Sequence, residues 1–410
     1  MTPTARPFSL LVKPAGADCN LRCDYCFYLS KAGLYPDLAH PRMSLTTVRA
    51  LLHQFFATPQ PVYAFAWQGG EPTLMGVDFF REVFAMQRSL APAGARITNG
   101  LQTNGTLLTQ QWAQLFREND VLVGLSIDGP PEIHDSYRRL TDRDGVPLQG
   151  AAGNTHARVE KIARMLRDER VSYNALTVVG SHNQNHAVEV YNYLRSLRIR
   201  HMQFIPLVEW EPGIDGRGPS AFSVTPDGWG GFLNAIFDRW FPRDIHRVSI
   251  RHHDSILEYL IQGRYNVCTM ATSCGGHIVI EHNGDMYPCD FYVESDLLLG
   301  NINDDAGVET KGCPSPPNRL ASAATSERYR RFMQQKAAPD ARCTACRHLA
   351  LCHGDCPKLR PKVQTDGERV SALCAGWRAF YDHALPAFER LRRTIVVTQT
   401  GRPPMRTDTS

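Results

Sequence analysis

The segment DCNLRCDYCFYL, residues 18–29, decides how the rest of the chain is interpreted. It places three cysteines in one short loop at the spacing Cys19-x3-Cys23-x2-Cys26. A 4Fe-4S cluster normally has four thiolate ligands, so three ligands leave one iron open to a substrate or cofactor. A zinc site or a set of buried thiols is the alternative. The spacing favours an open iron–sulfur site, and the surrounding motifs must decide.

The chain around this loop alternates between strand and helix patterns. Short β-prone runs are followed by stretches with helical periodicity. Such alternation predicts a mostly parallel sheet with helices outside, as an open or partial barrel with its chemistry at the C-terminal ends of the strands. The predicted strands are residues 8–12, 62–67, 95–103, 121–128, 171–179 and 201–208, and the predicted helices are 46–57, 78–90, 109–118, 155–168 and 185–197.

Polar motifs stand where the predicted strands end. Gln68-Gly69-Gly70-Glu71 follows the second strand, Gln102–Gly105 closes the third, and Ser126–Asp128 lies on the fourth. Two glycines let the backbone approach an amino-acid ligand closely, and Glu71 can pair with the ammonium group of that ligand. A Gly-Gly pair after a strand also suits an ordinary turn. The topology predicts that these motifs meet at one rim of the sheet.

The composition excludes several classes of function. The 410 residues carry 45 basic and 41 acidic side chains, and a net charge of +4 is too small to indicate a nucleic-acid or membrane-surface partner. The first residues contain only the short apolar run Phe8–Val12, and no stretch approaches the ~18 apolar residues of a membrane span. We therefore expect a cytoplasmic protein. Because the cytosol is reducing, the 12 cysteines favour metal or redox chemistry over disulfides.

A second dense set of cysteines follows a stretch, residues 27–267, that contains none. Asn283-Gly284 between two alternating runs predicts a β-hairpin, so that Cys289 lies at the end of a hairpin strand. Eight thiols suffice for two clusters with four ligands each, but Cys-x2-Cys pairs also suit tetrahedral zinc. These eight are Cys268, Cys274, Cys289, Cys343, Cys346, Cys352, Cys356 and Cys374.

The cysteine loop with Tyr25, followed by Gly69-Gly70-Glu71, resembles the radical S-adenosylmethionine superfamily. The resemblance implies a partial (β/α)6 TIM-like barrel, whose open iron binds the methionine part of S-adenosylmethionine and cleaves it to a 5′-deoxyadenosyl radical. It also implies a set of residues that contact this cofactor. For Ser126 a purely structural hydroxyl is the alternative, and for Arg138 an ordinary surface arginine. The set is Tyr25, Gly69, Gly70, Glu71, Ser126 and Arg138.

The later cysteines are spaced as in the SPASM domain, which carries two auxiliary clusters in a subset of this superfamily. The resemblance therefore implies three 4Fe-4S clusters in all. Cys313 matches no position and is expected to be a free thiol. The resemblance assigns Cys268, Cys274, Cys289 and Cys356 to auxiliary cluster I, and Cys343, Cys346, Cys352 and Cys374 to auxiliary cluster II.

Within this subset, CNLRCDYCFYL, WQGGEPTL, QTNGTLL, GLSIDGP, QFIP and PCDFYV resemble anaerobic sulfatase-maturating enzymes, over residues 8–390. The resemblance implies oxidation of a cysteine or serine in a Cys/Ser-x-Pro-x-Arg motif of an unfolded or nascent sulfatase to Cα-formylglycine, with flavodoxin or ferredoxin as reductant. Asp290 matches the general base of the family, beside auxiliary cluster I as electron acceptor. Tyr28, Gln68 and Gln102 match residues that line the substrate pocket. A hairpin aspartate that caps a turn, and rim residues that serve only the fold, are the alternatives.

The element pattern and the resemblance together divide the chain into four parts. A loop-like stretch and two helical patterns, near 226–241 and 253–262, separate the barrel from the cysteine-rich region. The expected parts are the barrel at 1–225, a helical linker at 226–265, the SPASM domain at 266–392 and a polar tail at 393–410.

Two other functions fit parts of the pattern. A related radical enzyme that crosslinks a small precursor peptide shares the cysteine motifs, but PCDFYV and the lack of an obvious peptide-binding domain before Phe8 favour sulfatase maturation. A non-catalytic iron–sulfur carrier or a zinc-stapled interaction protein would not need an open three-cysteine site beside Glu71.

Replacement of Cys313 by serine tests the assignment of the cluster ligands. Three cubane clusters hold about 12 iron atoms, and the other 11 of the 12 cysteines already supply their thiolates. We expect Cys313→Ser to keep the iron content and the activity of the unaltered protein, as measured by iron analysis and product formation. Loss of about four iron atoms from this variant would show that the ligand assignment is wrong.

Overall fold

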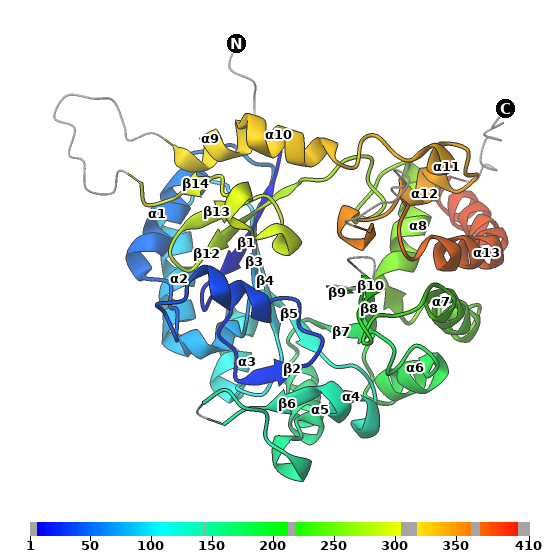
Figure 1. Cartoon of the computed structure of the whole chain (residues 1–410), viewed down its shortest axis with the longest axis horizontal. Coiled ribbons are helices and arrows are strands. Elements are labelled where there is room, and N and C mark those ends of the chain that lie inside the picture. The colour runs from blue at the N-terminus through cyan, green and yellow to red at the C-terminus, as the bar shows by residue number, and fades with distance from the viewer. Residues whose placement is uncertain (1–5, 143, 212–217, 305–317, 362–369, 401–410) are drawn as a thin grey trace. The chain divides into compact units, whose positions relative to one another are not determined.

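The computed structural model describes residues 6–142, 144–211, 218–304, 318–361 and 370–400, with side chains up to 395 (Figure 1). Cys313 lies outside these residues. The chain divides into two compact units. The first takes in the residues up to Ile127 together with Pro131–Ala175 and Cys274–Gln335, and the second takes in Asp128–Pro130, Leu176–Ser273 and the residues from Lys336 onward.

Six strands of the described chain are each followed by a helix, which confirms the predicted α/β fold with (β/α)6 order. Each end of these elements lies within two residues of its predicted position. The pairs are β1 (Ser9–Lys13) with α1 (Leu45–Phe56), β3 (Tyr63–Trp67) with α2 (Val77–Leu90), β4 (Ile97–Thr103) with α3 (Gln110–Glu118), β5 (Val121–Ser126) with α5 (His156–Asp168), β7 (Tyr173–Val179) with α6 (Ala187–Ser196), and β8 (His201–Pro206) with α7 (Pro226–Trp240).

The first unit is built on parallel strands in the order β5-β4-β3-β1-β12, with β12 at His277–Glu281. Each neighbouring pair is parallel. Helices α1, α2 and α3 lie along one side of β1, β3 and β4 (Figure 1). Aromatic rings fill the space between these layers: Phe55 meets Phe65 edge to face at a centroid distance of 5.2 Å, and Phe65 stacks on Trp67 at 6.1 Å. This apolar layer holds the strand ends, and therefore the site, in place.

The predicted hairpin is confirmed and belongs to the first unit. Strand β12 runs parallel to β1 in register from Ser9↔His277 to Lys13↔Glu281. The chain then turns through Gly284, at φ +94°, into the antiparallel strand β13 (Asp285–Tyr287), and β14 (Gly300–Asn301) pairs with β13. Cys289 follows β13 and precedes the 3-10 helix η4 (Asp290–Tyr292).

A small antiparallel pair was not expected from the sequence. Strand β2 (Leu21–Cys23) pairs with β6 (Arg138–Leu140), and Cys23 stands opposite Arg138. Strands of three residues carry too little periodicity to be recognised from the sequence. Their pairing connects the cysteine loop to the segment after α4 (Pro131–Tyr137).

Helices α7 and α13 (Cys374–Thr400) cross closely in the second unit. A Cβ on Gly230 would lie 3.0 Å from the Cα of Gly376, so only glycines allow this approach. The rings of Trp229 and Trp377 pack edge to face at 5.3 Å beside the crossing. Helix α13 was not among the predicted elements, because Pro386 inside it interrupts the helical pattern.

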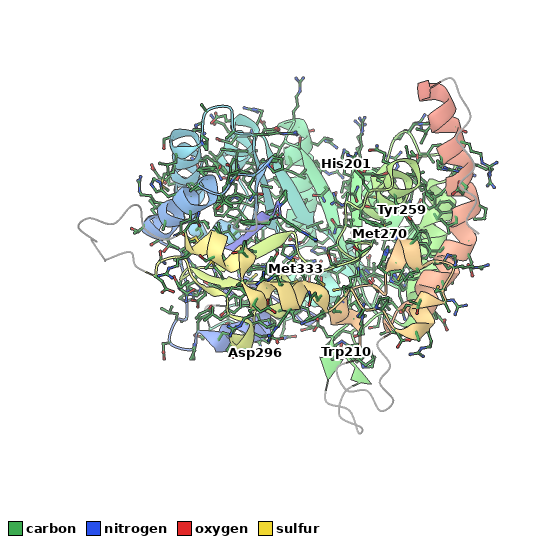
Figure 2. The ribbon with its side chains drawn as sticks, turned by 90° about the horizontal axis from the view of Figure 1, so that it is seen from above. His201, Trp210, Tyr259, Met270, Asp296 and Met333 are labelled. Atoms are coloured by element: carbon green, nitrogen blue, oxygen red, sulfur yellow. The ribbon has the colours of Figure 1, made fainter. Side chains whose placement is uncertain are left out.

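Short elements complete the two units. Trp210 of β9 (Figure 2) donates its indole N–H to the carbonyl of Lys358 at 2.9 Å. No helix within the described ranges is both long and apolar enough to cross a membrane. The remaining elements are β9 (Trp210–Glu211), β10 (Gly218–Pro219), β11 (Ser249–Ile250), α8 (Arg251–Gln262), α9 (Arg319–Thr325), α10 (Glu327–Gln334), α11 (Ala341–Thr344), α12 (Leu349–Cys352), η1 (Leu29–Leu34), η2 (Pro72–Met75), η3 (Gly150–Gly153), η5 (Ser295–Leu297) and η6 (Pro357–Leu359).

His253 of α8 is buried in an aromatic cage in the second unit. Its ring stacks on Phe380 at a centroid distance of 5.8 Å and lies 4.7 Å from Trp240. In the described structure neither ring nitrogen has a hydrogen-bond partner. Burial holds the pKa of His253 well below its ordinary value and lowers the pKa of His252 to about 4. Both rings are therefore neutral in the folded chain at neutral pH.

We expect the free energy of unfolding to fall as the pH drops below about 6.5, the ordinary pKa of histidine. The unfolded chain binds protons there that the folded chain does not, which costs about 1.4 kcal/mol per pH unit for each histidine. The contribution of His252 to this fall in the free energy of unfolding levels off near its folded pKa of about 4. Urea unfolding followed by tryptophan fluorescence measures this dependence. His253→Phe should remove the contribution of one histidine to the pH dependence of the free energy of unfolding. His246→Gln, at an exposed position, should leave this pH dependence unchanged. An unchanged pH dependence in His253→Phe would contradict this account.

Candidate functional site

Cys19, Cys23 and Cys26 lie in the segment that follows β1, which contains the short strand β2 ending at Cys23. The side-chain amide of Asn104 donates to the Cys19 sulfur at 3.7 Å. Burial raises the pKa of Cys19 well above its ordinary value, and the nearby carboxyl of Glu71 and thiols of Cys23 and Cys26 raise it further. The three thiols are thus close enough to influence one another. A cationic metal centre would reverse this effect by binding them as thiolates.

This donor set fits an iron–sulfur cluster. The three thiols are free of disulfide bonds, and soft thiolates are the ligands that such clusters take. Each thiolate of a cubane binds a different iron atom, so the ligands of a cubane stand farther apart than those of a single metal ion. The described residues contain no group of three His, Cys, Asp or Glu placed to hold a single metal ion.

Gly70 lets the backbone after β3 lie directly against the base of the cysteine loop. The N–H of Gly70 donates to the carbonyl of Gly16, and the N–H of Glu71 donates to the carbonyl of Asp18, both at 2.8 Å. A Cβ on Gly70 would lie 1.9 Å from the Asp18 carbonyl oxygen, a distance that no side chain can occupy. The close approach of the two loops therefore depends on glycine at this position.

Glu71 is fully buried and joins the loops after β3 and β4. Its Oε1 accepts the N–H and the hydroxyl of Thr73 at 2.9 and 2.5 Å and the hydroxyl of Thr103 at 2.8 Å. Its Oε2 accepts the backbone N–H of Asn104 at 2.8 Å. Burial raises the pKa of Glu71, and these hydrogen bonds act in the opposite direction. A carboxylate oxygen with one hydrogen bond can accept another, so Oε2 has capacity for a further donor.

Tyr25 and Arg138 are brought together by the β2–β6 pair. The guanidinium carbon of Arg138 lies 5.6 Å from the centroid of the Tyr25 ring, and both side chains are buried. Burial raises the pKa of Cys26, and the charges of Arg138 and Lys13 oppose this rise. Ser126 ends β5 and is half-buried. The predicted cofactor residues all belong to the first unit.

Asp290 follows Cys289 directly and forms an ion pair with Lys13, the last residue of β1. The Lys13 side chain is 2% exposed and that of Asp290 is 21% exposed. The ammonium nitrogen of Lys13 also lies 4.3 Å from the centroid of the Tyr28 ring. A buried cation thus holds a carboxylate that solvent or a substrate can still reach.

The three residues predicted to line the substrate pocket have different surroundings. Tyr28 is 2% exposed, packs with Val279 and donates its hydroxyl to Glu281. Gln68, just after β3, and Gln102, on β4, are half-buried. They stand at the C-terminal ends of two neighbouring parallel strands, so the structure brings the two glutamines to one edge of the sheet.

The four cysteines predicted for auxiliary cluster II lie near one another in the second unit. Burial raises the pKa of Cys374, and the thiols of Cys343 and Cys346 raise it further. Burial raises the pKa of Cys352 to about 12, with smaller contributions from Asp355 and Cys374. These mutual effects mean that thiols from α11, α12 and the start of α13 converge.

The cysteines predicted for auxiliary cluster I are divided between the two units. Cys274 and Cys289 belong to the first, where burial raises the pKa of Tyr329 to about 12 and both thiols contribute. Cys268 and Cys356 belong to the second. The N–H of Cys356 donates to the buried Asp355 carboxylate at 2.7 Å.

Three polar residues of this site were not expected from the sequence: Lys13, Glu281 and Asn104. Lys13 and Glu281 carried a signal, because each charged residue closes an apolar strand at the end where barrel chemistry occurs. Asn104 stood inside a motif but had no role of its own until its contacts with the cysteine loop were seen.

A family model described as the Radical SAM superfamily matches residues 14–194. A serine-type anaerobic sulfatase-maturating enzyme of Bacteroides thetaiotaomicron is 35% identical to this chain over 97% of the chain and 94% of that enzyme. The chain belongs to the anaerobic sulfatase-maturating enzymes.

Relatives of both substrate types occur in this family. A cysteine-type anaerobic sulfatase-maturating enzyme of Clostridium perfringens is 32% identical over 95% of the chain and 99% of its own length. The solved structure of anSMEcpe with bound AdoMet and Cp18Cys peptide matches with a TM-score of 0.82 and 31% identity, covering 95% of this chain and 100% of that one. The predicted family and the predicted TIM-like radical S-adenosylmethionine fold are therefore confirmed.

Gly70→Ala tests whether the close backbone approach holds this maturase site together. The added methyl group would force the Asp18 carbonyl, and with it the start of the cysteine loop, away from Glu71. We expect cleavage of S-adenosylmethionine to fall on the order of 10 to 100-fold, because displacements of about 1 Å have such effects. Formation of 5′-deoxyadenosine by the reduced protein measures this rate. The control is Gly33→Ala, whose added Cβ would meet nothing within 4 Å. Equal rates in the two variants would refute the role of Gly70.

Proposed function

We propose that this chain oxidises a cysteine or serine in a Cys/Ser-x-Pro-x-Arg motif of a sulfatase polypeptide to Cα-formylglycine. The observation that carries the proposal is the Asp290–Lys13 ion pair, which lies in the same compact unit as the three-cysteine loop. It supplies a proton acceptor beside the machinery for hydrogen abstraction. The names of the relatives, which include serine-type and cysteine-type sulfatase-maturating enzymes, support the same reaction.

The first unit fits one 4Fe-4S cluster and S-adenosylmethionine. When bound, these groups supply the radical that abstracts hydrogen from an unactivated carbon. Cys19, Cys23 and Cys26 would hold the cluster, and Oε2 of Glu71 can pair with the ammonium group of the cofactor. We assign the cofactor contacts to Tyr25, Gly69, Gly70, Glu71, Ser126 and Arg138.

The remaining ligands fit two further clusters, which would bring the total to about 12 iron atoms. The mutual effects among Cys343, Cys346, Cys352 and Cys374 support their assignment to auxiliary cluster II. Cys268, Cys274, Cys289 and Cys356 are assigned to auxiliary cluster I on the resemblance to the SPASM domain.

Asp290 acts on the substrate after hydrogen abstraction. Loss of a hydrogen atom from the substrate Cβ leaves one proton and one electron to be removed before a thioaldehyde or aldehyde can form. Asp290 takes the proton of the thiol or hydroxyl group, and its 21% exposure leaves the carboxylate within reach. The electron would leave to the acceptor that auxiliary cluster I supplies when bound. Tyr28, Gln68 and Gln102 are assigned to the lining of the pocket. Water then hydrolyses a thioaldehyde with loss of sulfide.

The relatives favour this reaction over peptide crosslinking. Sulfatase-maturating enzymes match nearly the whole chain at 30–35% identity. As partners we propose an unfolded or nascent sulfatase and a flavodoxin or ferredoxin reductant, in the cytoplasm. As domains we propose the barrel at 1–225, the linker at 226–265, the SPASM domain at 266–392 and the tail at 393–410.

Asp290→Asn separates radical formation from substrate oxidation. The amide keeps the size of the side chain but cannot serve as a base, and losing a general base costs on the order of 10² to 10⁴ in rate. We expect the variant to keep its iron and to cleave S-adenosylmethionine, while formylglycine falls by at least about two decades. Mass spectrometry of a Cys/Ser-x-Pro-x-Arg peptide measures the product.

The matched control is Asp296→Asn, at an exposed aspartate in η5 (Figure 2). It should leave iron, cleavage and formylglycine unchanged. Near-normal formylglycine formation by an iron-loaded Asp290→Asn protein would reject the assigned role, and a parallel loss of iron would make Asp290 structural.

A further inference from the structure

Lys13 is a buried lysine at the centre of the first unit. It ends β1, which has β3 on one side and β12 on the other, and its register partner in β12 is Glu281. Its side chain is 2% exposed. Burial of an ammonium group costs free energy unless the charge is paired. The groups that pair with Lys13 therefore also hold its ammonium group in position.

Gly69 makes room for the alkyl stem of Lys13. A Cβ at Gly69 would lie 2.8 Å from the carbonyl oxygen of Gly16, 3.2 Å from the Cδ of Lys13 and 3.4 Å from its Cβ, and the φ of Gly69 is +126°. The first glycine of the Gly69-Gly70-Glu71 motif therefore makes room both for the Gly16 carbonyl and for the Lys13 stem. The stem has little freedom to lie elsewhere.

The ammonium group of Lys13 is also held against an aromatic ring. It lies 4.3 Å from the centroid of the Tyr28 ring, a cation–π contact inside the protein. The ring itself is 2% exposed and is tied by its hydroxyl to Glu281. The charge can therefore act as a rigid anchor for the carboxylate that it meets.

Asp290 depends on this anchor. It begins the 3-10 helix η4, and its Oδ1 forms the ion pair with Lys13. Within the described part of the chain, Oδ2 accepts no hydrogen bond. Without Lys13 the carboxylate would be free to turn about its side-chain torsions.

We propose that Lys13 is the positioning residue for Asp290: it binds Oδ1 and leaves Oδ2 directed to the proton of the substrate. This inference rests on the proposed role of Asp290 as proton acceptor. Lys13 acts through Asp290 and does not touch the substrate. Its loss therefore lowers kcat for formylglycine without changing KM for the peptide.

Lys13→Met tests the inference in the iron-loaded, full-length protein. The substrate is a Cys-x-Pro-x-Arg peptide deuterated at Cβ, so that deuterium in 5′-deoxyadenosine reports hydrogen abstraction and formylglycine reports completion. We expect iron content and deuterium transfer to persist, kcat for formylglycine to fall on the order of 10 to 100-fold, and KM to stay the same. Lys13→Arg, which keeps the charge, should recover most of the loss. Normal formylglycine formation by Lys13→Met overturns the inference.

The control is Arg195→Met in the second unit. It also removes an ion pair to a mostly buried aspartate, because Asp244 is 16% exposed and lies 3.3 Å from Arg195 Nε. It should change neither kcat nor KM. An equal fall of formylglycine in this control would make the effect of Lys13→Met a general loss of stability and would overturn the inference.

The double variant Lys13→Met/Asp290→Asn separates failure of the inference from failure of the proposed function. If Lys13 acts through Asp290, the double variant is as slow as Asp290→Asn alone. A further fall of about tenfold or more overturns the inference, because Lys13 then acts by another route. Normal product from Asp290→Asn alone instead rejects the proposed function. The double variant removes both charges of the ion pair, whereas Lys13→Met alone leaves Asp290 without its partner. If Lys13→Met does not load iron, the comparison of the double variant with Asp290→Asn still tests the inference.

Discussion

Strand β1 hydrogen-bonds to β3 along one edge and to β12 along the other, and this double pairing places the functional groups of the first unit. The parallel register aligns Val12 with Trp67 and Lys13 with Glu281. Parallel strands end at the same edge of a sheet, so the segments that follow them meet there. The Gly-Gly-Glu segment comes from β3, the lysine from β1, and the aspartate from the hairpin that continues β12. A shift of one residue in either pairing would turn these side chains to the opposite face.

Two buried charges of opposite sign illustrate two ways of stabilising such a site. Glu71 is surrounded by hydroxyl and backbone N–H donors, which compensate its burial without a cation. Lys13 has a charged partner, Asp290, and an aromatic face. In both cases the surrounding groups fix the side chain before any ligand arrives. The carboxylate assigned to the cofactor and the carboxylate assigned to the substrate are therefore preorganised on a rigid sheet edge.

The thiols of the two units share one electrostatic condition. Burial raises the pKa of Cys19 and Cys26 in the first unit and of Cys352 and Cys374 in the second. Metal binding must displace the protons that these thiols hold, so cluster loading is coupled to pH and to folding. In the second unit the thiols come together on short helices, since α11 and α12 have only four residues each. Such short helices have few contacts of their own, so bound clusters would also stabilise the fold there.

The sequence by itself determined the alternation of strands and helices, the hairpin at Asn283-Gly284, the position of the cysteine loop after the first strand and the family. These features are local: periodicity, turn residues and cysteine spacing are each expressed within about ten to twenty residues. The tertiary structure alone decided that Lys13 meets Asp290, 277 residues away, that Arg138 stands opposite Cys23, and that Glu71 receives donors from the end of β4. Those contacts depend on which strands pair and in which register, and pairing is set by hydrogen bonds and packing between distant segments, which no local pattern encodes.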